Sequence, residues 1–247
     1  MEAYVERGIE LGLKEIGFSD HNPLPEGRGA KVRMLESELE YYVNRVQELQ
    51  FQYRGKIVVR LGLELDFVEG LEDYLAAQIA RYPWDYIIGS VHYFDRACEI
   101  GSWTRMYPGT ADQQWIRYGE QVKKLARSGL CDIIAHLDVV KRSTKQPSSA
   151  GLDALTGALE EIARVGVCME INTSGYRHKE LNTPQPYPNL AFVEQALKLG
   201  IPLTVNSDSH APDQVGTMFP KIEEFLRLRG GRQLCRFEKR QRSFYAL

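Results

Sequence analysis

Histidines and acidic residues recur in this sequence at one kind of position, directly after a run of apolar residues. The chain has five histidines, and four of them lie at such positions: His21, His92, His136 and His210. Glu64 and Asp208 also lie near the ends of apolar runs. Imidazole and carboxylate groups together favour Zn, Fe, Mn or Co over Ca, which prefers oxygen ligands alone. These six residues are our candidate metal ligands.

A lone histidine is a weak signal, because a histidine more often makes hydrogen bonds in the core or at the surface than it binds a metal. Four of the five histidines at equivalent positions are harder to explain in that way. His178 is the exception, since it lies between Arg177 and Lys179 in a polar segment that is typical of a solvated loop.

Other acidic residues near these positions have two interpretations. Asp20, Asp66 and Asp138 either orient the histidine ligands or act as caps and turn residues. Glu170 lies in another strand-like run, and a surface or ion-paired strand residue is its simpler interpretation.

Strand-like apolar runs alternate with helical patterns along the chain, which predicts a parallel sheet with helices outside it. Apolar residues at three- and four-residue steps indicate a helix over residues 34–53. Further helices are predicted at 1–13, 71–81, 111–128, 152–165, 190–199 and 222–228, and a final strand at 233–245. Six or seven such units favour a barrel over an open sheet. In a βα barrel the carboxyl ends of the strands form one site, which would bring the candidate ligands together.

Length, composition and charge limit the class of protein. The chain has 247 residues, is 43% hydrophobic and has a net charge of -2, which fits a single α/β domain over residues 1–247 with no nucleic-acid partner. No apolar run approaches the roughly 18 residues of a membrane span, and no signal peptide is evident. We therefore expect a cytoplasmic protein whose cysteines are reduced thiols: Cys98, Cys131, Cys168 and Cys235.

The common nucleotide-binding motifs and the motif of a serine nucleophile are missing from the sequence. The sequence has no G-x-G-x-x-G after a strand and no Walker loop. Ser207 and Ser209 are interpreted as turn residues, because no G-x-S-x-G elbow surrounds them.

Six short motifs together resemble the PHP (polymerase and histidinol phosphatase) family. They are Gly17-Phe-Ser-Asp-His21, Gly62-Leu-Glu-Leu-Asp66, Gly89-Ser-Val-His-Tyr93, Ala135-His-Leu-Asp138, Glu170-Ile-Asn-Thr-Ser-Gly175 and Asn206-Ser-Asp-Ser-His210. They occur in family order along most of the chain, and the resemblance is nearest to the histidinol-phosphatases. It implies a distorted (β/α)7 barrel with two or three divalent metals, Zn, Fe or Mn, at the strand ends.

The resemblance also implies roles for the candidate ligands. Glu64 would bridge two metals, His92 and His136 would complete one site, and Asp208 would bind the second metal; the third would be served by His21 and His210. The implied reaction is hydrolysis of L-histidinol phosphate to L-histidinol and phosphate, a step of histidine biosynthesis. Paired divalent ions suit this reaction because they hold a hydroxide and neutralise phosphate.

One family feature is missing from the sequence. Family members open with a strand that carries an H-x-H pair, and no such strand is present here. We therefore expect a barrel without its first strand and with unpaired edges on the two neighbouring strands. Two alternatives stay open: a PHP phosphoesterase with another small phosphoester or a nucleic-acid 3′ end as substrate, and a truncated, inactive PHP protein that binds a metal or a partner.

A small phosphate monoester also needs fixed cations in its site. Arg177 follows a strand end and is the first candidate for the phosphate, with Lys141 and Arg105 as further candidates. The alternative for each is a solvated surface cation. Arg177, Asp208 and His210 are the residues expected to act in catalysis. Three loop aromatic residues are candidates for packing on an imidazole ring, or are core-edge residues: Trp103, Tyr107 and Tyr176.

Overall fold

Six parallel strands form the central sheet. The computed structural model describes residues 1–25, 31–95, 98–99, 109–144, 146–179, 181 and 183–247. The strand order is β1-β2-β3-β6-β7-β8, and every neighbouring pair is parallel. The bounds are β1 Glu15–Phe18, β2 Val58–Asp66, β3 Tyr86–Ser90, β6 Ile133–Ile134, β7 Cys168–Asn172 and β8 Leu203–Asn206. This order follows the sequence, as expected for repeated β-α units.

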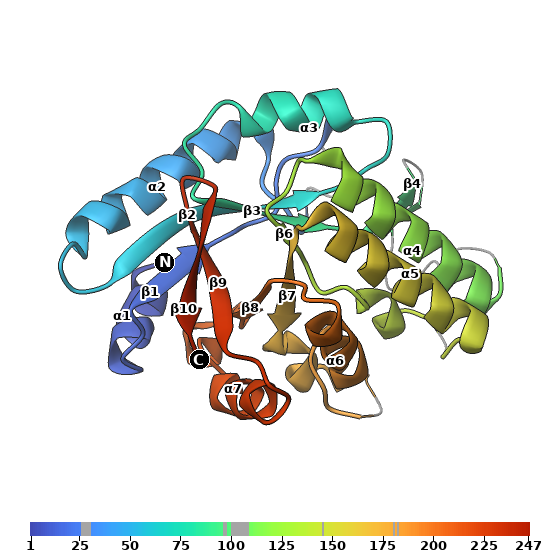
Figure 1. Ribbon diagram of the computed structural model, residues 1–247. Helices are drawn as coiled ribbons and strands as arrows, with labels where there is room; N and C mark the ends of the chain where they lie inside the picture. Colours follow the sequence, from blue (N-terminus) through green and yellow to red (C-terminus); the bar gives the residue numbers. More distant parts are fainter. Residues whose placement is uncertain (26–30, 96–97, 100–108, 145, 180, 182) are drawn as a thin grey trace.

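The helices lie outside the sheet, which curls so that Figure 1 shows them as an arc around it. The α-helices are α1 Glu2–Glu10, α2 Leu39–Gln52, α3 Glu72–Ile79, α4 Ala111–Ser128, α5 Ser149–Val165, α6 Leu190–Lys198 and α7 Phe219–Leu228. Short 3-10 segments are η2 Glu36–Glu38, η3 Val139–Arg142, η4 Thr173–Arg177 and η5 Pro212–Gln214. A small antiparallel pair, β4 Tyr93–Asp95 and β5 Cys98–Glu99, follows β3.

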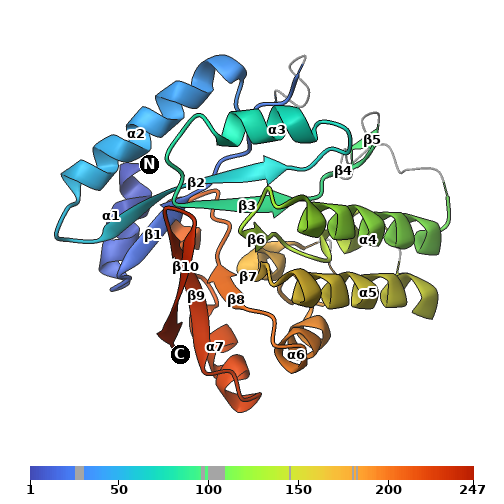
Figure 2. The same cartoon turned by 45° about the horizontal axis from the view of Figure 1, so that its top comes forward.

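Local signals explain where the two long helices begin and end. The side chain of Thr110 accepts a hydrogen bond from Gln113 N at the start of α4, and Gly129 ends that helix with φ 68. α5 begins at Ser149, three residues before the predicted start, because the Ser148 hydroxyl caps the helix by accepting from Ala150 N. α4 and α5 pack side by side on the outside of the sheet (Figure 2).

Alternate strand residues face two different clusters of buried side chains. Ile87, Ile134 and Met169 belong to the large core between the sheet and the helices. Their neighbours in sequence face the other way and pack in a smaller cluster with the C-terminal residues: Ile88, Ile133, Ala135, Cys168, Cys235 and Phe237. Cys131, Cys168 and Cys235 are buried free thiols, as predicted.

The C-terminal segment is a hairpin, so the prediction of a single strand over residues 233–245 was wrong. β9 Gln233–Glu238 and β10 Gln241–Ala246 pair in antiparallel register around Lys239 and Arg240, which have φ 50 and 62. The turn lies at the amino ends of the sheet strands. There Lys239 N donates to Asp85 Oδ1 at 3.2 Å, and Arg240 Nε donates to Asp132 Oδ2 at 3.0 Å. Figure 1 shows the hairpin on the side where the curled sheet is open, beside β1 and β8.

The predicted α/β class with a PHP-type parallel sheet is confirmed. Among the described residues, β1 and β8 each pair with one strand only, so the sheet is an open, curled half-barrel and not a closed barrel. In the part of the chain that the structure describes, no helix combines the length and apolar character needed to cross a membrane.

Candidate metal centre

Four predicted ligands meet at the carboxyl ends of four neighbouring strands. His21 follows β1 and forms a parallel bridge with Glu64 of β2, while His92 and His136 follow β3 and β6. The Glu64 carboxylate lies between two imidazoles: Oε2 is 3.7 Å from His21 Nε2, and Oε1 is 3.3 Å from His136 Nε2. One ligand atom from each of Glu64, His92 and His136 lies within 4.8 Å of the other two. The ring centroids of His21 and His136 are 5.2 Å and 4.9 Å from that of His92.

Asp66 orients two of these histidines from behind. Its Oδ2 lies 3.0 Å from His21 Nδ1, and its Oδ1 lies 2.6 Å from His92 Nδ1. A carboxylate only accepts, so each Nδ1 atom donates a proton to Asp66, and Nε2 is the ring nitrogen that each histidine can offer to a metal. The Asp66 carboxylate is fully buried and also accepts from Arg33. Of the two sequence interpretations of Asp66, the structure favours the orienting partner.

The charges at the site are strongly coupled. Burial alone would lower the pKa of His21, but the charges of Glu64 and Asp66 raise it to about 10. Burial likewise opposes the charged form of His136, yet hydrogen bonding to Glu64 and its charge raise that pKa to about 9. Burial would raise the pKa of Glu64, and the neighbouring histidines lower it to about 2. In the absence of an ion, buried carboxylates therefore hold protons on the imidazoles as the compensating positive charge.

This donor set fits a divalent transition metal. It combines imidazole nitrogens with a carboxylate, which suits Zn, Fe or Mn. The positive charge that protons supply here is the charge that an ion would supply. The two oxygens of Glu64 face different histidines, as a carboxylate shared between two ions requires.

Asp208 lies at the margin of this cluster, and His210 lies outside it. β8 ends at Asn206, and Asp208 has a positive φ of 46, so the strand does not continue and the two side chains do not share a strand face. Asp208 Oδ2 accepts from Asn172 Nδ2 at 3.1 Å, and its charge contributes to the raised pKa of His136. The His210 side chain is 78% exposed, with Nδ1 3.1 Å from the Asp208 carbonyl oxygen.

The predicted phosphate-binding cations differ in what they contact. Arg177 is half-buried, and its Nη2 donates to the carbonyl oxygens of Ser207 at 2.8 Å and Asp208 at 2.7 Å. The Lys141 ammonium is buried in an ion pair with Asp138 at 2.9 Å, and it also donates to Pro186 O at 2.9 Å. Arg105, Trp103 and Tyr107 lie outside the described residues.

Two further predicted loop residues contact residues that are not candidate ligands. Tyr176 contacts Lys221, whose ammonium is 4.7 Å from the ring centroid. His178 lies against Tyr187, with ring centroids 5.9 Å apart.

Sequence reasoning missed several residues that support the site. Arg33 comes from a segment with no periodic pattern, and only the structure shows its buried contact with Asp66. Asn22 directly follows His21; its side chain is fully buried, and its Oδ1 accepts from Asp66 N at 2.8 Å. Asn172 and Asn206 could have been found, because each follows a strand-like run close to a candidate ligand.

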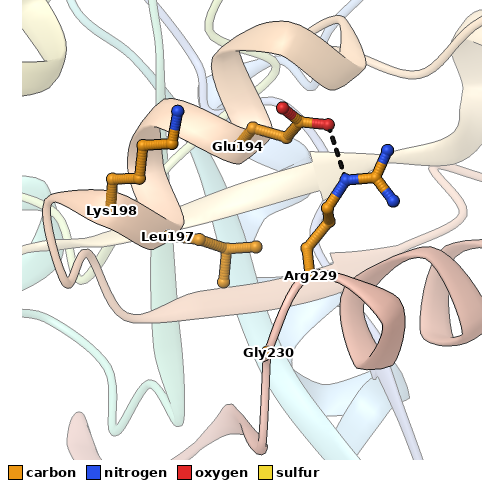
Figure 3. Close-up of a pocket in the computed structure, with 5 residues that line it drawn as sticks. All are labelled: Glu194, Leu197, Lys198, Arg229 and Gly230. Atoms are coloured by element: carbon orange, nitrogen blue, oxygen red, sulfur yellow. Dashed lines mark hydrogen bonds and ion pairs between the residues drawn. The ribbon is translucent and has the colours of Figure 1, made fainter.

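A shallow pocket elsewhere on the protein is lined by none of the residues that were predicted to bind metal or substrate. Figure 3 shows it between α6 and the end of α7, where Glu194 Oε1 accepts from Arg229 Nε at 2.8 Å. Its lining consists of Glu194, Leu197, Lys198, Arg229 and Gly230, which bring no histidine or metal-binding cluster together.

Comparison with known proteins decides the family. Residues 1–174 match the PHP domain. The chain belongs to the PHP domain family. The motif resemblance seen in the sequence is thereby confirmed.

Named PHP relatives of this chain are histidinol-phosphatases, which are phosphoric monoester hydrolases. The chain is 35% identical over 237 residues to a probable histidinol-phosphatase of Deinococcus radiodurans, covering 93% of this chain and 87% of that protein. It is 23% identical over 256 residues to the histidinol-phosphatase of Bacillus subtilis, covering 92% of this chain and 91% of the relative.

Solved structures of PHP proteins share the fold. The histidinol phosphate phosphatase of Lactococcus lactis, solved with zinc, L-histidinol and phosphate, superposes with a TM-score of 0.82 at 21% identity, covering 98% of this chain and 92% of that one. A putative histidinol phosphatase of Listeria monocytogenes has a TM-score of 0.80 at 20% identity, covering 89% and 92%.

Proposed function

We propose that this PHP protein is a metal-dependent phosphomonoesterase that hydrolyses L-histidinol phosphate to L-histidinol and phosphate in histidine biosynthesis. The observation that carries the proposal is the position of the Glu64 carboxylate between His21 and His136. The buried Asp66 orients the imidazole of His21 and that of the neighbouring His92. The 35% identical relative is a probable histidinol-phosphatase. The Lactococcus lactis protein of the same fold has been solved with zinc, L-histidinol and phosphate.

In this proposal the cluster residues hold divalent ions. Glu64, His92 and His136 hold one ion, and Glu64 with Asp208 contributes to a second. His21 and His210 are proposed for a third, which requires the exposed His210 side chain to turn toward His21. When bound, such ions supply positive charge against the phosphate and lower the pKa of water. Asp66 holds the His21 and His92 rings so that their Nε2 atoms face inward.

Arg177 is the cation that we assign to the phosphate. It lies beside Asp208 at a strand end, and its guanidinium keeps a fixed position because it donates to two carbonyl oxygens. A guanidinium fixed in this way is preorganised to stabilise negative charge on the phosphate. The Lys141 ammonium is buried and engaged with Asp138 and Pro186, so we do not assign Lys141 to the phosphate.

Phosphate release tests the proposal. The protein, loaded in turn with Zn²⁺, Mn²⁺ and Fe²⁺, is incubated with L-histidinol phosphate and, separately, with a set of other small phosphomonoesters. We expect release of inorganic phosphate that is fastest with L-histidinol phosphate and is lost on chelation. The His136→Ala variant should bind less metal and release no inorganic phosphate.

The other outcomes separate the alternatives. Faster release from a different monoester would replace the substrate while keeping the reaction class. A chain that binds metal but releases phosphate from no substrate would contradict the enzyme and favour a metal-binding protein without turnover.

A further inference from the structure

Glu170 is a buried carboxylate at the centre of a network that joins three strand ends. It lies on β7, which pairs with β6 on one side and β8 on the other, and it is 3% exposed. Its Oε2 accepts from the backbone N of His136 at 2.9 Å and from Asn172 Nδ2 at 3.1 Å. Its Oε1 accepts from Asn206 Nδ2 at 2.9 Å. One carboxylate thus fixes groups from β6, β7 and β8.

Asn172 extends this network to Asp208. Its Oδ1 accepts from Ser174 N at 2.9 Å, which fixes the orientation of the amide. The Nδ2 group therefore faces two carboxylates, and it donates to Glu170 Oε2 and to Asp208 Oδ2, each at 3.1 Å. Two candidate ligands are therefore connected to Glu170: His136 directly through its backbone N, and Asp208 through the Asn172 amide.

The network requires a carboxylate at this position. Every partner of Glu170 in these hydrogen bonds is an N–H donor, and a carboxylate can accept from all of them. A glutamine would present an NH₂ group to at least one donor and leave a buried polar group unsatisfied. An aspartate keeps the charge but is one methylene shorter.

We infer that Glu170 is a positioning residue, which holds His136 and Asp208 in place for metal binding without contacting the ion itself. Each of its two oxygens already accepts from a neighbouring N–H group. Among the described residues, two groups of side chains bring their ligand atoms close enough to hold an ion: His21, Asp66 and His92, and Glu64, His92 and His136. Glu170 belongs to neither group. The inference deepens the proposed function and rests on its metal site.

Zinc affinity of the folded chain tests this role. Zn²⁺ binding is measured by competition with a chromogenic chelator for the wild type, Glu170→Gln and the control Glu161→Gln. Glu161 is also a largely buried glutamate, but it lies on α5 and pairs with Arg127 and Arg164. We expect Glu170→Gln to lose about 10- to 100-fold in affinity, with circular dichroism like that of the wild type. Glu161→Gln should bind Zn²⁺ like the wild type.

If Glu170→Gln does not fold, the same role can be tested with variants of the two asparagines that donate hydrogen bonds to Glu170. Asn206→Ala removes one donor at a half-buried position, and Asn172→Ser removes the amide that joins Glu170 to Asp208. Both should weaken Zn²⁺ binding, and Glu170→Asp should restore part of the affinity lost in Glu170→Gln. Wild-type affinity in every folded variant would overturn the inference.

The same data separate this inference from the proposed function. A wild-type chain that binds no Zn²⁺ would contradict the metal site and, with it, both proposals. A wild-type chain that binds Zn²⁺ with an affinity unchanged by Glu170→Gln, Asn172→Ser and Asn206→Ala would contradict only the role of Glu170. With metal at saturating concentration, kcat for L-histidinol phosphate should fall in Glu170→Gln while KM changes less, because the substrate contacts remain.

Discussion

Asp66 accepts hydrogen bonds from two imidazoles that follow different strands, and a guanidinium balances its charge. His21 and His92 are thereby held with their Nδ1 atoms on one side and their Nε2 atoms on the other. Arg33 provides the balancing charge from a segment that the sequence left unassigned. The two histidines were recognised from their positions after apolar runs, whereas the role of Asp66 depended on three-dimensional contacts.

Asp66→Asn should weaken metal binding although no ligand is removed. The amide cannot accept from both histidines and Arg33 at once, so the rings lose their fixed orientation, and we expect about 10- to 100-fold lower Zn²⁺ affinity. Asp132→Asn is the matched control, because Asp132 is also largely buried and accepts from Ile87 N and Arg240, but at the amino end of the strands. Chelator competition should show equal affinity for this control and the wild type. Equal affinity for Asp66→Asn would contradict the orienting role.

Metal uptake should release protons. In the metal-free chain the carboxylates raise the pKa of His21 to about 10 and of His136 to about 9, so both imidazoles are protonated at pH 7. A histidine must lose this proton to bind a metal, so the apparent affinity should rise as the pH increases from 7 toward 9. Titration calorimetry in buffers of different ionisation enthalpy measures the release, and we expect about two protons per chain at pH 7. A binding heat that is independent of the buffer would contradict this charge arrangement.

Among the elements, the strand ends bring the candidate ligands together because neighbouring parallel strands end at one edge of the sheet. Alternating apolar runs were sufficient to predict this order. The helix predicted over residues 111–128 is α4 with the same bounds, and in the structure Thr110 caps its start and Gly129 ends it. The C-terminal hairpin could not be predicted in the same way. Its turn uses Lys239 and Arg240 at positive φ, where glycine or asparagine is the usual sequence signal.

The end of β8 shows a second limit of sequence patterns. Asp208 and His210 are two residues apart, a spacing that puts two side chains on one face of a continuing strand. The positive φ at Asp208 turns the chain away from that course. Arg177 holds this backbone through the Ser207 and Asp208 carbonyl oxygens, a long-range contact without any sequence signal.

Close packing of the strands depends on glycine at two positions. A methyl group at Gly62 or Gly17 would overlap the ring of Tyr86, whose hydroxyl donates to Phe18 O at 3.1 Å. We therefore expect Gly62→Ala to lower the free energy of unfolding by about 1 to 3 kcal/mol. Gly157→Ala is the control, because that site on α5 has only ordinary contacts with the Lys123 side chain, and alanine there should be neutral or stabilising by up to about 1 kcal/mol. Urea unfolding compares them, and equal stability of the two variants would contradict the packing argument.

In the molecule as a whole, the candidate metal centre and the hairpin turn occupy opposite ends of the strands. Arg240 joins the turn to Asp132 just before β6, whereas His136 follows β6 at the other end. The structure therefore separates residues that stabilise the fold from residues that hold the site, as is general for enzymes built on βα units.

Arg240→Ala should lower stability without affecting metal binding. It removes the charge-assisted hydrogen bonds to Asp132, and the side chain is partly exposed, so we expect a loss of about 1 to 2 kcal/mol. Arg236→Ala is the control on the same hairpin, because Arg236 is exposed and contacts Ser243 at 3.3 Å. Thermal unfolding and Zn²⁺ competition are measured together. A large loss of Zn²⁺ affinity in Arg240→Ala would contradict the separation of the two ends.

Anomalous diffraction at the zinc edge, from a crystal of this chain soaked in Zn²⁺, would show whether these residues bind the ion. We predict a zinc peak about 2.0 to 2.2 Å from an oxygen of Glu64 and from imidazole nitrogens of His92 and His136. Zinc found only at surface sites, with Glu64 still held between His21 and His136, would contradict it.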